Sequence, residues 1–391
     1  MKRFLLVFFG IVVFTSISFL ILLYINSFTF VWMWSVWLAV LVVIIIKARS
    51  HRTKLVTIYA ASALFAVFLA EVYFSGLLGF RYERIHYEHQ LYQGAYIQQH
   101  EVLGRALVPG SKWWIKYAYG DSLSYDIVQS VDANGLRLTL GEHEPEAAPV
   151  LFMGCSFTFG HGLSDHETIA SFFQQSNKHL EAINMGQSGF GIHQTLAIFE
   201  NGLEESHIEE KQPKAAFYSA LTDHTFRGKN ALIGDFGPKY ELNKNNEPEF
   251  QGLLSHRLCS LSELLEKSHL LTRYVLRRRP STEADIDLLA IMIEKSARLF
   301  SDRYDAPFYC LLWEEPYAEE GLYDKLLEKL KARNIKVIEV ADMLPGYDKN
   351  PWQYFLYKDI HPNALANKLI GEYLSELLDE QENEIESPEN P

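Results

Sequence analysis

The chain has 391 residues and a net charge of −13. This length is enough for a globular domain of roughly 200 residues together with a further segment. The acidic balance, and the lack of a basic stripe beside an aromatic platform, exclude the usual modes of nucleic-acid binding.

Residues 1–80 are predicted to form three transmembrane helices, because a bilayer span needs about 20 apolar residues. The three apolar stretches carry no charge other than Glu71, and they cover 4–25, 30–46 and 55–80. A cleaved signal peptide is the alternative for the first stretch, which is longer than a usual signal core and lacks a small-x-small cleavage site. Glu71 lies near the outer end of the third predicted span, where we favour a structural or interfacial role over a functional one.

Basic residues in the short connections predict the orientation of these helices. They precede the first span and fill the link between the second and third: Lys2, Arg3, Lys47, Arg49, Arg52 and Lys54. The turn at 26–29 has none. Both basic segments are therefore expected in the cytoplasm, and everything after about residue 80 on the extracytoplasmic side of a multi-pass membrane protein.

Residues 81–148 are predicted to be a small β-rich appendage that connects the membrane region to the next domain. Turn signals occur at Val108-Pro-Gly110 and Asp132-Ala-Asn-Gly135. The alternating runs 113–119 and 125–131 indicate a β-hairpin. For Trp113 and Trp114, core packing is favoured over stacking on a sugar or contact with the membrane surface.

Residues 149–378 alternate between strand and helix patterns, which predicts an α/β fold. The expected strands are 149–154, 180–185, 214–221, 306–312 and 335–340. The expected helices are 166–177, 191–204, 252–277, 283–302, 318–333 and 363–378. Five short parallel strands flanked by helices indicate a flavodoxin-like three-layer sandwich. Residues 224–251 are expected to be an insertion or active-site loop, and 379–391 a disordered acidic tail.

Ser156 follows the first of these strands, with Gly154 before it and Gly160 after it. The carboxyl ends of the strands are where open α/β sheets place their active sites. A helix is expected to begin near His166, with Ser164 or Asp165 as its N-cap. The alternative is a glycine-rich turn with an incidental serine.

Asp359-Ile-His361-Pro-Asn363 precedes the last predicted helix. An acid two residues from a histidine can hold the imidazole in one tautomer while the ring takes a proton from a serine. With Gly154-x-Ser156-Phe-Thr-x-Gly160 early in the domain, this chain resembles the SGNH hydrolases (GDSL-like esterases), as a membrane-anchored member. Asn184, Gly186 and Gly189 match the second block of that family, and the resemblance covers about 150 to 378.

The resemblance implies a serine hydrolase site without a metal or organic cofactor. Ser156 would be the nucleophile, His361 the base and Asp359 the residue that orients it. The oxyanion hole would combine the backbone N–H groups of Ser156 and Gly189 with Thr222. Four other histidines near the blocks are more typical of loop or surface positions: His161, His166, His193 and His224, the last being the best reserve for the base.

Three positions depart from the family pattern. Cys155 replaces an acid, and Thr222 stands where the family has an asparagine. The acid often found three residues before the histidine is here Lys358, although Asp-x-His occurs in acetylation-related members. Cys155 and Cys310 lie in apolar runs, which indicates buried free thiols.

The combined expectation is an extracytoplasmic esterase or acyltransferase of the bacterial inner membrane, acting on O-acetyl esters of envelope glycans. A transferase would need a partner membrane protein, because three helices are too few for an acyl-donor channel. Two alternatives remain: a lipase or lysophospholipase acting on lipid esters, and an inactive module that binds glycan or scaffolds an envelope assembly.

Overall fold

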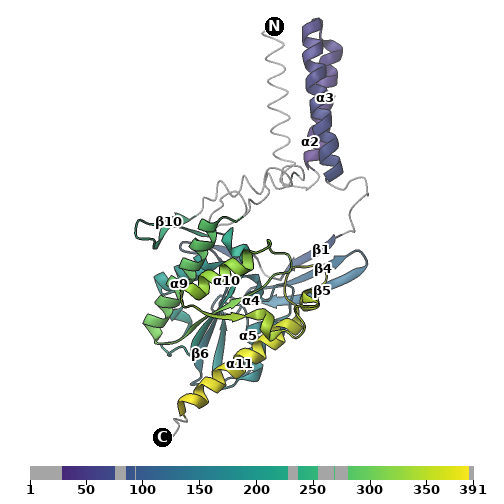
Figure 1. Ribbon diagram of the computed structural model, residues 1–391. Helices are drawn as coiled ribbons and strands as arrows, with labels where there is room; N and C mark the ends of the chain where they lie inside the picture. Colours follow the sequence, from purple (N-terminus) through teal and green to yellow (C-terminus); the bar gives the residue numbers. More distant parts are fainter. Residues whose placement is uncertain are drawn as a thin grey trace. The chain divides into compact units, whose positions relative to one another are not determined.

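The computed structural model describes residues 29–74, 85–92, 94–227, 237–253, 268 and 281–386. These residues belong to two compact units (Figure 1). The first contains two apolar helices and Ser268, and the second contains every other described residue.

The first unit is built from α2 (Thr29–Lys47) and α3 (His51–Phe74), which pack against each other. One described helix, His51–Tyr73, is long and apolar enough to cross a membrane by length and composition, and Trp34–Lys47 is a shorter apolar helix. The predicted first span, 4–25, lies outside the described residues. The prediction of three spanning helices is therefore not confirmed, since a single described helix meets the length requirement.

Glu71 is buried within this unit, where it is 1% exposed. Its carboxylate accepts a hydrogen bond of 2.9 Å from the Ser268 hydroxyl, 197 positions further along the chain. A buried carboxylate with a bonded partner fits the structural role that the sequence favoured.

The second unit is organised around a five-stranded parallel sheet in the order β12-β11-β8-β6-β7. The strands are β6 (Ala148–Met153), β7 (Leu180–Asn184), β8 (Ala215–Ala220), β11 (Phe308–Leu312) and β12 (Lys336–Glu339). If the five strands are numbered in chain order and read from the β7 edge, their order is 2-1-3-4-5, which is the flavodoxin-like arrangement. All five predicted strands occur, each with ends within two residues of the prediction.

Helices cover both faces of the sheet, which confirms the predicted three-layer sandwich. One face packs on α6 (Ile192–Asn201), α9 (Glu283–Tyr304) and α10 (Leu322–Ala332), and the other on α5 (Ile169–Ser176) and α11 (Ala364–Glu386). Because side chains alternate along a strand, Leu151 and Met153 of β6 enter the first core, while Val150 and Phe152 enter the second. Cys310 lies in the first core and Cys155 in the second, and both are buried free thiols as predicted.

Two predictions need correction, and a third falls mostly outside the described residues. The segment expected to be helical from 166 begins with the 3-10 turn η1 (Asp165–Glu167), which Ser164 caps, and Thr168 caps α5 itself. The expected helix 252–277 falls mostly outside the described residues, and its first two residues end strand β10. The tail expected to be disordered from 379 is helical to Glu386, because Asn177 donates to Asp379 and Tyr309 bonds Gln381.

The β-rich segment contains the antiparallel sheet β1-β4-β5 and the hairpin β2–β3. Its strands are β1 (Ile85–Leu91), β2 (Ile97–His100), β3 (Gly104–Leu107), β4 (Lys112–Tyr119) and β5 (Ser122–Ser130). The β4–β5 pair is the predicted hairpin. Trp113 is 3% exposed and its ring stacks on Phe159 at 6.1 Å, so core packing, the favoured interpretation, is correct for this residue.

A second hairpin follows β8 within the predicted insertion 224–251. It consists of β9 (Pro238–Leu242) and β10 (Pro248–Leu253). Short helical turns complete the unit: α4 (Ser156–Phe159), η2 (Glu205–His207), η3 (Thr222–Thr225), η4 (Val340–Met343) and η5 (Pro351–Tyr354).

Candidate active site

The candidate site lies where the strand order of the sheet reverses. The second strand of the domain, β7, lies on one side of β6 and the third, β8, on the other. Open α/β sheets bind ligands in the crevice outside the carboxyl ends of the strands at such a point. Ser156 begins α4 three residues after β6 ends, and Thr222 follows β8 by two residues.

Asp359 and His361 form a bonded pair in the turn before α11. The Asp359 carboxylate accepts the His361 backbone N–H at 3.1 Å and lies 2.6 Å from Nδ1 of the ring. With the Nδ1 proton directed to Asp359, Nε2 is left as the atom that can accept a proton. Burial alone would raise the pKa of Asp359, but its bonds to His361 and the positive charges of His361 and His161 lower it.

Lys358 does not take part in this pair. Its Nζ lies 5.2 Å from the centroid of the Tyr119 ring, and its backbone carbonyl accepts a hydrogen bond from the Tyr117 hydroxyl. Of these two positions, Asp359 is therefore the one that contacts His361.

The turn with Ser156 and the turn with His361 lie next to each other. The ring of Phe157, the residue after Ser156, is 5.7 Å from the His361 ring between centroids. Ser156 is 8% exposed. Within the described part of the chain, no hydrogen bond joins the Ser156 hydroxyl to His361. Catalytic hydrogen bonds are often long before substrate binds and tighten in the complex, so this geometry keeps the pair as candidates.

His161 is a neighbour of this pair that the sequence analysis named but expected to be a loop or surface histidine rather than the base. Its ring centroid is 4.4 Å from that of His361, and its Nε2 lies 3.4 Å from the Tyr125 hydroxyl. Burial and the neighbouring charge of His361 lower the pKa of His161 to about 4, so it is neutral at neutral pH. One signal was available: His161 lies five positions after Ser156, within reach of the same turn.

The other histidines occupy positions away from this chemistry. His193 and His224 are fully buried, so the expectation of loop or surface positions is wrong for both. The Nδ1 of His224 is 2.6 Å from the Tyr218 hydroxyl, and burial lowers its pKa well below the ordinary value. His224 therefore belongs to the core rather than to a reserve base, and His166 is exposed as expected.

One group of metal-type ligands occurs among the described residues. Ligand atoms of His161, Asp359 and His361 all lie within 4.8 Å of one another. These side chains are the Asp359–His361 pair and the neighbouring His161. Their hydrogen bond and ring contact explain why the three lie close together.

Gly189 lies in the loop between β7 and α6, and the backbone requires a glycine there. Its φ is +81°, and an added Cβ would lie 1.9 Å from the guanidinium of Arg105, which donates to the Ser188 carbonyl at 3.0 Å. Asn184 ties the start of this loop to the Ser156 turn by donating to the Thr158 carbonyl at 2.9 Å. Among the described residues, no acceptor takes the backbone N–H of Ser156 or of Gly189, so both remain candidates for the oxyanion hole.

Thr222 does not fit its predicted role. Its hydroxyl lies 3.1 and 3.2 Å from the two carboxylate oxygens of Glu315, and its backbone N–H donates to the same group at 3.3 Å. A threonine hydroxyl that donates to a carboxylate cannot also donate to an oxyanion. The third oxyanion donor predicted for this site is thus committed elsewhere.

Glu315 is a buried acid that the sequence analysis missed, at 3% exposure. Burial raises its pKa to about 7, although the hydrogen bonds from Thr222 and Asp223 favour the charged form. A perturbed carboxyl group beside an active-site turn is a frequent feature of functional sites. The only feature of the sequence that could have pointed to Glu315 is its position, three residues after the end of strand β11.

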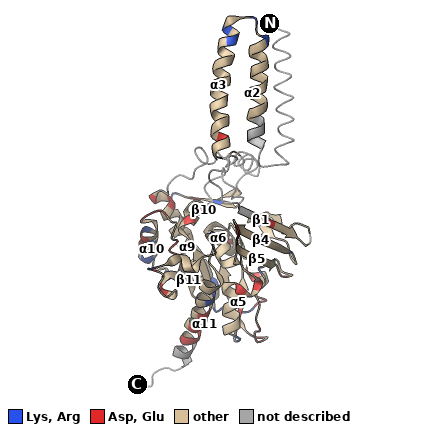
Figure 2. Ribbon diagram, turned by 90° about the vertical axis from the view of Figure 1, so that its right-hand side faces the viewer, with Lys and Arg blue, Asp and Glu red and all other residues tan. Residues whose placement is uncertain are grey.

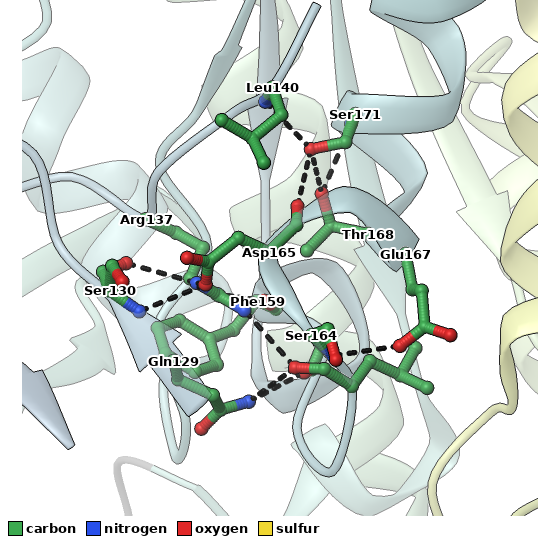
Figure 3. A network of polar contacts seen from close by, with 12 residues as sticks. Gln129, Ser130, Arg137, Leu140, Phe159, Ser164, Asp165, Glu167, Thr168 and Ser171 are labelled. Carbon is green, nitrogen blue, oxygen red and sulfur yellow. Dashed lines mark hydrogen bonds and ion pairs between the residues drawn. The ribbon is translucent and has the colours of Figure 1, made fainter. Parts of the chain in front are cut away.

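A buried arginine holds the backbone that follows Ser156 (Figure 3). Arg137 is 1% exposed and pairs with the carboxylate of Asp165. Its guanidinium also donates to three carbonyl groups, those of Phe159, Ser130 and Leu163. Gln129 adds a bond of 2.8 Å to the Gly160 carbonyl. We call this set, Gln129, Arg137 and Asp165, the arginine clamp, since it fixes the β-rich segment to the loop that follows Ser156.

Comparison with protein-family models gives no match, and comparison with curated proteins gives none either. Solved structures similar to this chain include members of the lipolytic G-D-S-L family. The protein from Veillonella parvula is 16% identical, with a TM-score of 0.36 over 59% of this chain and 97% of its own. That from Desulfitobacterium hafniense is 16% identical, with a TM-score of 0.33 over 59% and 99%. The acetylxylan esterase Axe2 from Geobacillus stearothermophilus is 12% identical, with a TM-score of 0.34 over 61% and 96%.

Proposed function

We propose that this protein is a serine esterase or acyltransferase of SGNH type. The observation that carries the proposal is the Asp359–His361 pair, bonded at 2.6 Å beside the turn that begins with Ser156. The pair lies at the strand-order reversal of a flavodoxin-like sheet, where the ligand crevice of such folds occurs.

The chemistry follows from these groups. The Ser156 oxygen attacks the acyl carbonyl, and His361 Nε2 takes the hydroxyl proton. Asp359 stabilises the imidazolium that forms, and the N–H groups of Ser156 and Gly189 stabilise the oxyanion. Collapse of the tetrahedral intermediate breaks the ester bond, His361 returns the proton to the leaving alcohol, and the acyl group stays on Ser156. Water then releases the acid, or a sugar hydroxyl accepts the acyl group.

Substrate and location belong to the same proposal. The domain is held by its apolar helices at the extracytoplasmic face of a bacterial inner membrane, where envelope glycans with O-acetyl esters are the available substrates. The apolar lengths of α2 and α3, and the basic residues at their link, support this placement. An acyltransferase would take its acyl group from a partner membrane protein.

Replacement of the nucleophile tests the reaction. We expect Ser156→Ala to lower kcat for p-nitrophenyl acetate by about 10³-fold or more, and to abolish labelling by a fluorophosphonate probe. Ser176→Ala is the matched control, because Ser176 is an exposed serine on α5. Full activity of folded Ser156→Ala would refute the proposal.

A catalytically inactive binding module is the second candidate. It is favoured by the commitment of the Thr222 hydroxyl to Glu315 and by the lack of a Ser156–His361 hydrogen bond within the described residues. Folded wild-type protein that neither reacts with a fluorophosphonate nor cleaves an acetyl ester would establish this alternative.

A further inference from the structure

An aromatic pocket lies between the β-rich segment and the parallel-sheet domain. It encloses about 160 Å³. Its walls include the rings of Tyr87 on β1, Tyr96 before β2 and Trp113 on β4, together with His161 from the loop after Ser156. The nearly buried Trp113 ring packs against the Tyr96 ring, with 4.8 Å between the ring centroids, and so supports this aromatic wall from the core side.

Two polar side chains line this pocket without a hydrogen-bond partner among the described residues. The Nε2 atom of Gln187 and the Oγ atom of Ser188 are both buried and unbonded. Gln187 as a whole is only 6% exposed. Buried polar groups are normally hydrogen-bonded, so these two atoms can take the hydrogen bonds of a polar ligand in the pocket.

The position of the pocket connects it to the reaction centre. Gln187 and Ser188 directly precede Gly189, a candidate oxyanion donor. On the other wall, the His161 ring is 4.4 Å from the His361 ring. A molecule in the aromatic pocket therefore contacts the two residues before Gly189 and the His161 ring, which in turn contacts the proposed base His361.

We propose that the aromatic pocket binds the sugar ring that carries the ester, which names the substrate class of the site and rests on the proposed function. A pyranose has apolar C–H faces that lie against aromatic rings and hydroxyl groups that bond Gln187 and Ser188. Ligand pockets combine mostly apolar walls with a few placed polar groups in this way. A fatty acyl chain would leave both polar groups unmet.

The experiment compares two acetyl esters on the full chain in a sugar-free detergent. Methyl 6-O-acetyl-glucopyranoside needs the pocket, whereas p-nitrophenyl acetate lacks a sugar. We expect Gln187→Leu and Tyr87→Ala each to lower kcat/KM about tenfold for the sugar ester and less than about twofold for p-nitrophenyl acetate. Tyr92→Ala is the matched control, since Tyr92 has a similar exposure to Tyr87, 52% against 55%, and does not line the pocket.

Equal losses on both esters, or no loss on either, would overturn the inference and leave the pocket filled by water. If the wild-type protein cleaves neither ester, the proposed function fails, and binding then decides the inference. Saturation-transfer NMR with methyl glucoside should give a signal for wild type and Tyr92→Ala that Gln187→Leu and Tyr87→Ala lose. No signal for wild type would refute the pocket as a sugar site.

Discussion

Asp359 reaches His361 because the backbone bends at Lys358. Lys358 has a φ of +54°, in the left-handed region that side chains other than glycine adopt infrequently. The bend returns the Asp359 carboxylate toward both the backbone N–H and Nδ1 of His361. Asp359, two positions before His361, is therefore placed to orient the imidazole ring.

Removing the charge at Asp359 tests this orientation. We expect Asp359→Asn to lower kcat for p-nitrophenyl acetate by about 10³- to 10⁴-fold, because an amide favours the wrong tautomer of His361. Asp348→Asn, an exposed aspartate ahead of the same turn, should leave kcat unchanged. Activity of Asp359→Asn within tenfold of wild type would assign the orienting role to another group.

Glu315 should make the stability of the domain depend on pH. Its pKa of about 7 in the folded protein lies above the ordinary value of 4.5, so the folded state binds this proton more tightly than the unfolded chain. The stabilisation is complete below pH 4.5 and is lost as the pH rises through 7, a change of roughly 3 kcal/mol in the free energy of unfolding.

Glu315→Gln removes this titration and keeps an acceptor for Thr222. We expect wild type to lose stability relative to the variant between about pH 5 and about pH 8, as measured by urea unfolding at each pH. His161 titrates in both proteins, so its contribution to the pH dependence of stability cancels in this comparison. Parallel pH profiles would show that the buried carboxyl group keeps its ordinary affinity for protons.

Residue-scale prediction from sequence succeeded where partners are close in the chain. The Asp359–His361 pair spans two positions, and its motif was readable. The Thr222–Glu315 contact spans 93 positions, and nothing in either local sequence indicates the other. The hydroxyl of Thr222 was assigned to the oxyanion hole because Thr222 stands where the resembled family has an asparagine, and Glu315, which engages this hydroxyl, follows a different strand.

At the scale of elements, the strands of the parallel sheet were predictable because they are buried on both faces. Val150, Leu151, Phe152 and Met153 form a continuous apolar run, all at 1% exposure or less. The β2–β3 hairpin was not predicted, since its strand Ile97-Gln-Gln-His100 is mostly polar. This strand pairs with β3, and its own sequence has no alternating apolar pattern that would have predicted it.

The arginine clamp joins two elements that the sequence places in separate segments. Arg137→Met keeps the length of the side chain but removes the charge that pairs with Asp165, a carboxylate that is 17% exposed and still accepts the Ser130 N–H. Breaking one side of a buried ion pair typically costs about 3–5 kcal/mol. We expect a loss of stability of that size by chemical unfolding, together with lower activity, because the loop behind Ser156 loses its hydrogen bonds.

The double variant Arg137→Met with Asp165→Leu separates the charge effect from packing. It should be less destabilised than the sum of the two single variants, because neither charge then remains unpaired. Glu283→Gln with Lys325→Gln provides an exposed ion pair for comparison, and we expect no measurable change in the free energy of unfolding there, because water screens both charges. Additive losses in the clamp would mean that its two charges act independently.

At the scale of the whole molecule, charge is distributed very unevenly between the two units. Along α2 and α3 the charged residues are confined to the link between the helices and to Glu71 (Figure 2). The acidic excess of the chain belongs to the α/β unit and its last helix, α11, whose sequence after Leu378 is rich in acids. The described residues 29–74 therefore carry a net charge of +3, four basic residues against Glu71, whereas the net charge of the whole chain is −13.

The basic link predicts which way that pair of helices is inserted. Lys47, Arg49, Arg52 and Lys54 lie within or beside the short connection of α2 and α3, and a basic connection of this kind stays in the cytoplasm. Helix α3 then runs outward, whatever precedes α2. Alkaline phosphatase fused after residue 391 should therefore be active and a fluorescent protein fused there should be dark.

Changing the four basic residues to glutamine should weaken this preference and give a mixed population, because the charge bias is the feature that orients the pair. The same four substitutions should leave p-nitrophenyl acetate hydrolysis by detergent-extracted protein unchanged, since none of these residues belongs to the α/β unit. A bright fluorescent fusion of the wild-type chain would place Ser156 and His361 in the cytoplasm. Envelope glycans would then be out of reach, and the proposed substrate class would fall even if the serine chemistry held.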